Sequence, residues 1–155
     1  MATSAGSGAF QGKGFGYNWA IDKTGSYDIN AGDLVWFDTS AHTLKPADTD
    51  AHMAYLVGWA YDSSFLNLYG TKKYDDSIVG VAAGAGRFKT TSGDTYHDGD
   101  TCYLGADAQT ITNTAGGNTH SVGVIHLPGG NTVSGGTGTL VEMIVLPQFP
   151  GTGVA

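Results

Sequence analysis

The sequence predicts an all-β protein: a small β-barrel or β-sandwich built from short antiparallel strands, with an extended N-terminal arm. Three observations support this fold class. The 155 residues include 25 glycines and only 14% charged side chains, and glycine suits tight turns but costs about 1 kcal/mol relative to alanine inside a helix. Short apolar runs alternate with turn-forming residues from residue 31 onward, which is typical of barrels and sandwiches. A pattern of turns and strands also occurs twice.

The apolar runs define the predicted strands in chain order. They lie at residues 33–38, 54–61, 77–83, 85–90, 101–104, 109–112, 120–127 and 139–146. The polar residues around 43–46 predict a loop, and residues 65–74 predict a loop with one helical turn, because Phe65, Leu68 and Tyr69 have helical spacing. The glycine-rich tract 128–138 predicts a flexible or hairpin loop before the last strand.

The repeated pattern consists of a Gly-Asp turn, a polar loop and a Val-Gly strand. Its members are Gly32-Asp33, Thr43-Leu44 and Val57-Gly58 in the first copy, and Gly99-Asp100, Thr110-Ile111 and Val122-Gly123 in the second. The first two pairs recur about 67 positions later and the third about 65 positions later. We interpret this spacing as a small β unit that is used twice within one barrel-like body.

Composition divides the chain into an arm, a domain and a tail. Residues 1–27 are rich in Gly, Ser and Ala and contain four aromatic residues, namely Phe10, Phe15, Tyr17 and Trp19. This segment is predicted to be a flexible or extended arm, and its aromatic rings are the candidate contacts with a partner. Packing of the arm on its own barrel is the alternative. Residues 28–147 are predicted to form a single β-barrel domain, and residues 148–155 a C-terminal tail after Pro147.

Net charge and hydropathy restrict the classes of partner. The net charge is −7, and an acidic body repels phosphate backbones and anionic lipid, so neither nucleic acid nor a membrane is an expected partner. No apolar run is long enough to span a membrane, and the N-terminus has no secretion-signal pattern. The single cysteine, Cys102, lies in a predicted strand and is expected to be a buried apolar residue.

The search for catalytic or metal-binding patterns finds none, so the sequence predicts no enzyme, no metal and no cofactor. The five histidines have no zinc-ligand spacing, and they are His42, His52, His97, His120 and His126. Asp48 and Asp50 lack the further oxygen donors of a calcium loop. No nucleophile elbow and no phosphate-binding glycine loop is present. Trp36 and Trp59 lie in apolar strands and are expected in the core.

The order of these motifs resembles the decoration, or cement, proteins of tailed-phage capsids. The similar stretches are Gly32-Asp33-Leu34-Val35, Thr43-Leu44-Lys45-Pro46-Ala47, Leu56-Val57-Gly58-Trp59-Ala60, Gly93-Asp94, Gly99-Asp100-Thr101-Cys102-Tyr103 and Ser121-Val122-Gly123-Val124. They span roughly residues 28–146 and consist of turns and strands. The segment 63–74 and the histidine-bearing loops have no counterpart in the family.

The resemblance implies a structural virion protein, made in the host cytoplasm and located on the outer capsid surface. It would bind the expanded phage head, self-associate as a homotrimer and cement neighbouring major-capsid subunits against the internal pressure of the DNA. An alternative from the residues themselves is a carbohydrate- or receptor-binding β-module of a fibre or adhesin, in which aromatic rings and aspartates bind sugars. A small β-barrel hydrolase that uses Glu142 or His97 is a third, more distant alternative.

Overall fold

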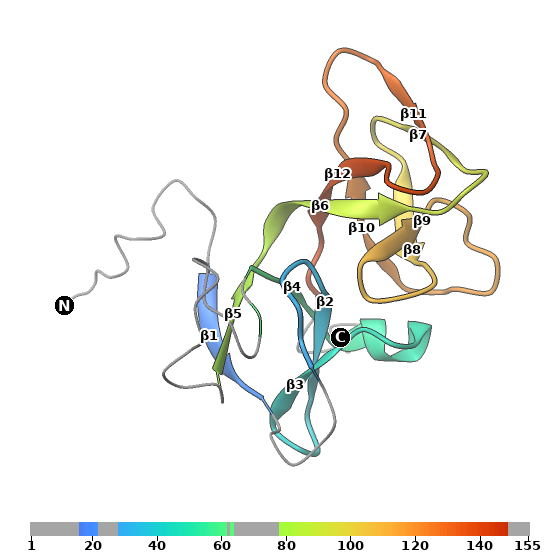
Figure 1. The fold of residues 1–155 in the computed structure, drawn as a ribbon. Helices are drawn as coiled ribbons and strands as arrows, with labels where there is room; N and C mark the ends of the chain where they lie inside the picture. Colours follow the sequence, from blue (N-terminus) through green and yellow to red (C-terminus); the bar gives the residue numbers. More distant parts are fainter. Residues whose placement is uncertain (1–15, 22–27, 62, 64–77, 149–155) are drawn as a thin grey trace.

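The structure, a computed structural model, describes residues 16–21, 28–61, 63 and 78–148, and the regular secondary structure of these residues is almost entirely β (Figure 1). This confirms the predicted fold class. The strands are β1 (Gly16–Ala20), β2 (Leu34–Asp38), β3 (Thr43–Pro46), β4 (Leu56–Ala60), β5 (Ile78–Ala82), β6 (Gly84–Thr90), β7 (Thr95–His97), β8 (Thr101–Leu104), β9 (Thr110–Thr112), β10 (Ser121–Ile125), β11 (Thr132–Ser134) and β12 (Leu140–Val145). A 3₁₀ helix, η1 (Asp50–Tyr55), precedes β4. No helix among the described residues is long and apolar enough to cross a membrane.

Ten of these strands form two five-stranded layers, one an open sheet and the other a closed barrel. The first, here called the N-terminal sheet, has the order β1-β5-β4-β2-β3, and its edge strands are joined by an isolated parallel bridge between Ile21 and Leu44. The second, here called the C-terminal barrel, is closed in the order β10-β12-β6-β9-β8. One pair in the barrel, β6 with β9, is parallel. The sequence predicts antiparallel strands, and this pair is the exception. A small β7–β11 ribbon extends from the barrel (Figure 1).

The two layers are copies of one unit, as the repeated pattern predicts. Strand β2 pairs with β3 and β4, and β8 pairs with β9 and β10. Phe37 faces Leu44, and the residues 67 positions later, Leu104 and Ile111, also face each other. The β2–β4 ladder has an irregularity after Val35↔Gly58, and the β8–β10 ladder has one at the equivalent place, beside Cys102↔Gly123.

The equivalence extends to all five strands of each layer. Strand β5 corresponds to β12 and β1 corresponds to β6, because Asn18↔Gly80 in one layer matches Arg87↔Glu142 in the other. The isolated bridge Ile21↔Leu44 then corresponds to Thr90↔Ile111, where β6 and β9 close the barrel. The N-terminal sheet is therefore a barrel of the same design that is closed at a single point.

The Gly-Asp turn before β2 and β8 is built in the same way in both copies. The Asp33 carboxylate accepts a hydrogen bond from the backbone N–H of Asn30 at 2.8 Å, and the Asp100 carboxylate accepts one from the backbone N–H of His97 at 2.8 Å. The glycine before each aspartate has a positive φ, 96° at Gly32 and 87° at Gly99. Only glycine adopts this conformation without strain, which explains why both copies keep it.

Two buried clusters fill the interior. The cluster of the N-terminal sheet contains Ile21, Ile29, Val35, Leu44, Ala60, Val79 and Val81. The cluster of the C-terminal barrel contains Tyr96, Cys102 and Ile111, which lie 67 positions after Ile29, Val35 and Leu44 of the first cluster. It also includes residues of the first unit. These additional residues are Leu34, Trp36, Ala47, Met53 and Leu56. Because β2 is buried on both faces, its outward side chains join the two units into one apolar interior.

Each predicted strand is present, with ends within two residues of the prediction. The prediction of a loop at residues 43–46 is wrong, since this segment is strand β3. The tract 128–138 is a hairpin loop that also carries β11, and β7 and η1 were not expected. Within the predicted arm, residues 16–20 form β1 and pair with β5. The helical turn expected at 65–74 lies outside the described residues.

Candidate functional site: the seam between the two units

The candidate interface residues of the arm are only partly described. Phe10 and Phe15 lie outside the described residues, and Tyr17 is placed in β1 opposite Val81. Trp19 is half-buried, its ring centroid lies 5.3 Å from that of Phe37, and it packs against the cluster of the N-terminal sheet. At Trp19 the structure therefore matches the alternative in which the arm packs on its own body.

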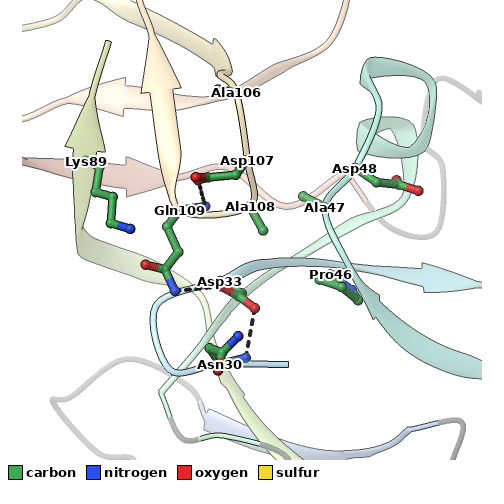
Figure 2. A pocket seen from close by; sticks show the side chains of 10 residues that line it. All are labelled: Asn30, Asp33, Pro46, Ala47, Asp48, Lys89, Ala106, Asp107, Ala108 and Gln109. Atoms are coloured by element: carbon green, nitrogen blue, oxygen red, sulfur yellow. Dashed lines mark hydrogen bonds between the residues drawn. The ribbon is translucent and has the colours of Figure 1, made fainter. Parts of the chain in front are cut away.

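A pocket of about 530 Å³ opens along the seam between the two units (Figure 2). Its ten lining residues come from the turn before β2, the end of β3, strand β6 and the β8–β9 loop, and they are Asn30, Asp33, Pro46, Ala47, Asp48, Lys89, Ala106, Asp107, Ala108 and Gln109. Figure 2 shows Lys89 and Gln109 on one side of this pocket and Asp48 on the other. Sequence reasoning missed it, because its lining positions are far apart along the chain: Asp33 and Gln109, for example, are separated by 76 residues.

Asp33 is the buried polar centre of the seam. Only 4% of this residue is exposed, and a buried carboxylate requires hydrogen-bond donors. Gln109 Nε2 donates to Asp33 Oδ1 at 2.8 Å, the Asn30 backbone N–H donates to Oδ2, and the Leu34 N–H donates to the Ala108 carbonyl at 2.7 Å. The aspartate of the repeated Gly-Asp turn thus ties the first unit to the β8–β9 loop of the second.

The rim of the pocket carries charges of both signs. Desolvation opposes ionisation of Asp107, but hydrogen bonds from the Gln109 backbone and the Thr110 hydroxyl, with the nearby charge of Lys89, lower the pKa of Asp107 overall. Its carboxylate is therefore ionised at neutral pH. The ten lining residues include no Ser, Thr, Cys or His, and the pocket supplies amide, carboxylate and ammonium groups.

A second polar junction lies where η1 meets the loop before β10. The Asp50 carboxylate accepts hydrogen bonds from the backbone N–H groups of Thr119 and His120 at 3.0 and 2.9 Å and from the Thr119 hydroxyl at 2.8 Å. His120 Nδ1 lies 3.1 Å away. Desolvation opposes ionisation, but these hydrogen bonds outweigh it and lower the pKa of Asp50 to about 2.

We expect Asp50→Asn to lower the free energy of unfolding by about 2 kcal/mol at neutral pH, because it removes charge-assisted hydrogen bonds. The pKa of Asp50 is lower in the folded state, so its stabilisation is present above the unfolded value of 3.8 and is lost as the pH falls towards about 2. Urea unfolding of the wild type and the variant should therefore give curves that converge as the pH falls below about 4. Asp28→Asn is the matched control, since Asp28 is exposed. A difference that stays constant with pH would contradict this assignment.

Four of the five histidines lie close to carboxylate oxygens, and the single cysteine is buried. His52, His97 and His120 each lie within 3.4 Å of an aspartate oxygen, and His126 lies 3.8 Å from both Asp98 and Glu142. Cys102 is buried, as predicted, and desolvation raises the pKa of its thiol to about 12. Across the described part of the chain, no group of three or more His, Cys, Asp or Glu side chains could hold a metal ion.

Trp36 is buried as predicted, with 7% exposure, and Trp59 is partly buried against the same cluster. His52 stacks on the Trp36 ring at a centroid distance of 3.8 Å. Known proteins give no further assignment: no protein-family model matches this sequence, and no curated protein sequence matches it significantly.

Proposed function

We propose that this chain is a structural virion protein that binds the outer surface of a tailed-phage head and cements neighbouring major-capsid subunits. The observation that supports it is the fold of the repeated pattern. Each copy of the Gly-Asp and Val-Gly pattern that carries the resemblance forms the same five-stranded unit, with the same register and the same turn. The turns and strands that carry the resemblance thus lie at equivalent places in the two units, which supports the proposal.

A body of this kind suits a binding role on a shell. The two units share one apolar interior, which holds their outer surfaces in a fixed arrangement before binding. Many copies on a lattice add their contacts, so each contact can be modest. A closed homotrimer made in the host cytoplasm, as the resemblance implies, would add further contacts around a symmetry axis. The proposal assigns no catalytic role and no cofactor to the chain.

The test is co-sedimentation of the purified chain with mature heads that lack it. We expect saturable binding, and we expect deletion of residues 1–15, which removes Phe10 and Phe15 but keeps β1, to weaken binding at least about tenfold. A melting temperature equal to that of the full chain is the control for folding. A full-length chain that stays in the supernatant would contradict the cement function, and a truncated chain that binds as tightly as the full chain would contradict the role of the arm.

One observation favours the carbohydrate- or receptor-binding alternative. The seam pocket offers amide and carboxylate groups of Asn30, Asp33, Asp107 and Gln109, which are suitable partners for hydroxyl groups. Its ten lining residues include no aromatic ring for stacking on a sugar. A rise in melting temperature with a sugar, combined with no binding to heads, would favour this alternative over the cement function.

A further inference from the structure

The outer face of β6 and β12 is the most apolar exposed surface that the structure describes. Three of the four exposed large apolar residues lie on β12 or directly after it: Leu140 is 49% exposed, and Ile144 and Leu146 are each 40% exposed. Side chains alternate along β12, so Leu140, Glu142 and Ile144 share the outward face while Val141, Met143 and Val145 fill the barrel.

The same face carries most of the positive charge that the structure describes. Arg87 and Lys89 are exposed on β6, in a chain whose net charge is −7, and Lys89 also lines the seam pocket. Among the described residues, neither of these two side chains forms a salt bridge within 4 Å, whereas Lys45 is paired with Asp38 at 2.6 Å. Exposed aliphatic side chains next to cations on one sheet face indicate an interaction surface.

The duplicated unit shows that the fold does not require these residues. The N-terminal sheet has Asn18 where β6 has Arg87, and Ala20 where β6 has Lys89. It likewise has Ala82 where β12 has Ile144. At the position of Leu140 the first unit also has an aliphatic residue, Ile78. The features that only the second unit has are therefore the two cations and Ile144, and they have a purpose other than building the strand pair.

The register of β6 and β12 makes this face complementary to itself. Arg87 lies opposite Glu142, Lys89 opposite Leu140, and Ala85 opposite Ile144. A twofold axis parallel to the strands and midway between them would place β6 of one copy over β12 of the other, with residue levels preserved. Arg87 of each copy would then lie over Glu142 of the other, and small Ala85 over large Ile144. A twofold axis perpendicular to the strands would instead place Arg87 over Arg87.

We propose that the outer β6–β12 face is a self-association surface, on which two copies of this chain pair about a twofold axis parallel to the strands. The partner is a second copy because the face supplies both members of each complementary pair. The pairing does not depend on the proposed function, and it differs from a threefold contact, in which a surface meets a different surface of its neighbour. On a shell it would connect neighbouring oligomers.

The size of the face sets the strength of the contact. Strand β12 has six residues, which at about 3.4 Å per residue give a length of about 20 Å, and two strands about 4.8 Å apart give a width of about 10 Å. A contact of this area belongs to the weak class of interfaces, so pairing is expected at high micromolar concentration rather than at nanomolar concentration.

Sedimentation velocity of the full chain tests the proposal, with variants Arg87→Glu and Glu142→Arg. Each single variant would place two like charges over each other twice per dimer, so self-association should weaken at least about tenfold. A mixture of the two variants makes every pair opposite in charge, so mixing should restore association to about the wild-type level. Tyr55→Ser is the matched control, because Tyr55 is 37% exposed but lies on η1 and not on β6 or β12.

The outcomes separate this proposal from the cement function. A wild type that stays monomeric up to about 500 µM, well within the range for weak interfaces, would overturn the pairing. Single variants that associate as the wild type does, or a mixture that associates no better than its components, would overturn it as well. A monomeric wild type with variants that no longer sediment with heads would assign the face to the capsid, which overturns the pairing but supports the cement function. Thermal unfolding near that of the wild type shows that each variant is folded.

Discussion

Gly123→Ala should be among the most destabilising single substitutions in this chain, with a cost of about 3 kcal/mol or more. A Cβ atom at Gly123 would collide with the backbone oxygen of Ile144 and would lie 2.7 Å from Met143 Cγ. The side chain could move, but the backbone oxygen belongs to the neighbouring strand β12 and is held by the ladder. For a domain of this size, the loss lowers the melting temperature by roughly 6–12 °C.

The duplicated unit supplies a second test of the same cause. Gly58 is the equivalent position in the first unit, where a Cβ would collide with the backbone oxygen of Ala82. Gly58→Ala should therefore destabilise the protein by a similar amount. Gly117→Ala is the control, since no atom lies within 4 Å of a Cβ placed there. If Gly123→Ala cost no more than Gly117→Ala in thermal or urea unfolding, close strand packing would not be the reason for the repeated Val-Gly pair.

Leu34→Ala should cost about 3 kcal/mol, in the middle of the range for a fully buried leucine. Leu34 is 0% exposed and belongs to the cluster that fills the C-terminal barrel, although it lies on β2 of the first unit. Its removal leaves a cavity between the two units, so both should lose stability together. Hydrogen exchange should show faster opening at amides of β2 and also of β8 or β9.

Thr101 provides the matched control for this substitution. It occupies the position of Leu34 in the second unit, 67 residues later, but it is exposed. Thr101→Ala should change the free energy of unfolding by less than about 0.5 kcal/mol. Faster exchange limited to β2 in the Leu34 variant would show that the two units unfold independently, which would contradict a shared interior.

The strands with continuous or alternating apolar residues could be predicted from sequence, but the strands formed by polar residues could not. Strand β3 contains Lys45 and Pro46, and Trp36 Nε1 donates to the Pro46 carbonyl at 3.1 Å. Its pairing with β2 gives it its structure, and tertiary contacts of this kind override local propensity. Strands β7 and β11 have three residues each, too few for a periodic pattern. Strand β1 lies in a glycine-rich segment without alternation, and it forms because β5 offers an edge.

The repeat was visible in the sequence, but the seam was not. The Gly-Asp and Val-Gly pairs predicted two copies of a unit because turns and close strand packing restrict residue type locally. The contact of Asp33 with Gln109 joins residues 76 positions apart, and no local pattern encodes such a distance. The candidate residues of the arm were chosen as aromatic rings in a segment of low complexity, and of these only Trp19 has a described side chain, which packs on Phe37.

The outward side of β2 is apolar, whereas the equivalent side of β8 and β10 is polar. Leu34, Trp36 and Leu56 cover the next unit in the series, but the matching positions of that unit are Thr101, Tyr103 and Ser121. Arrays of stacked repeats stay finite and soluble when the terminal member presents a polar outer side. By this substitution of polar for apolar residues, the second unit lacks the apolar side on which another copy of the unit could stack.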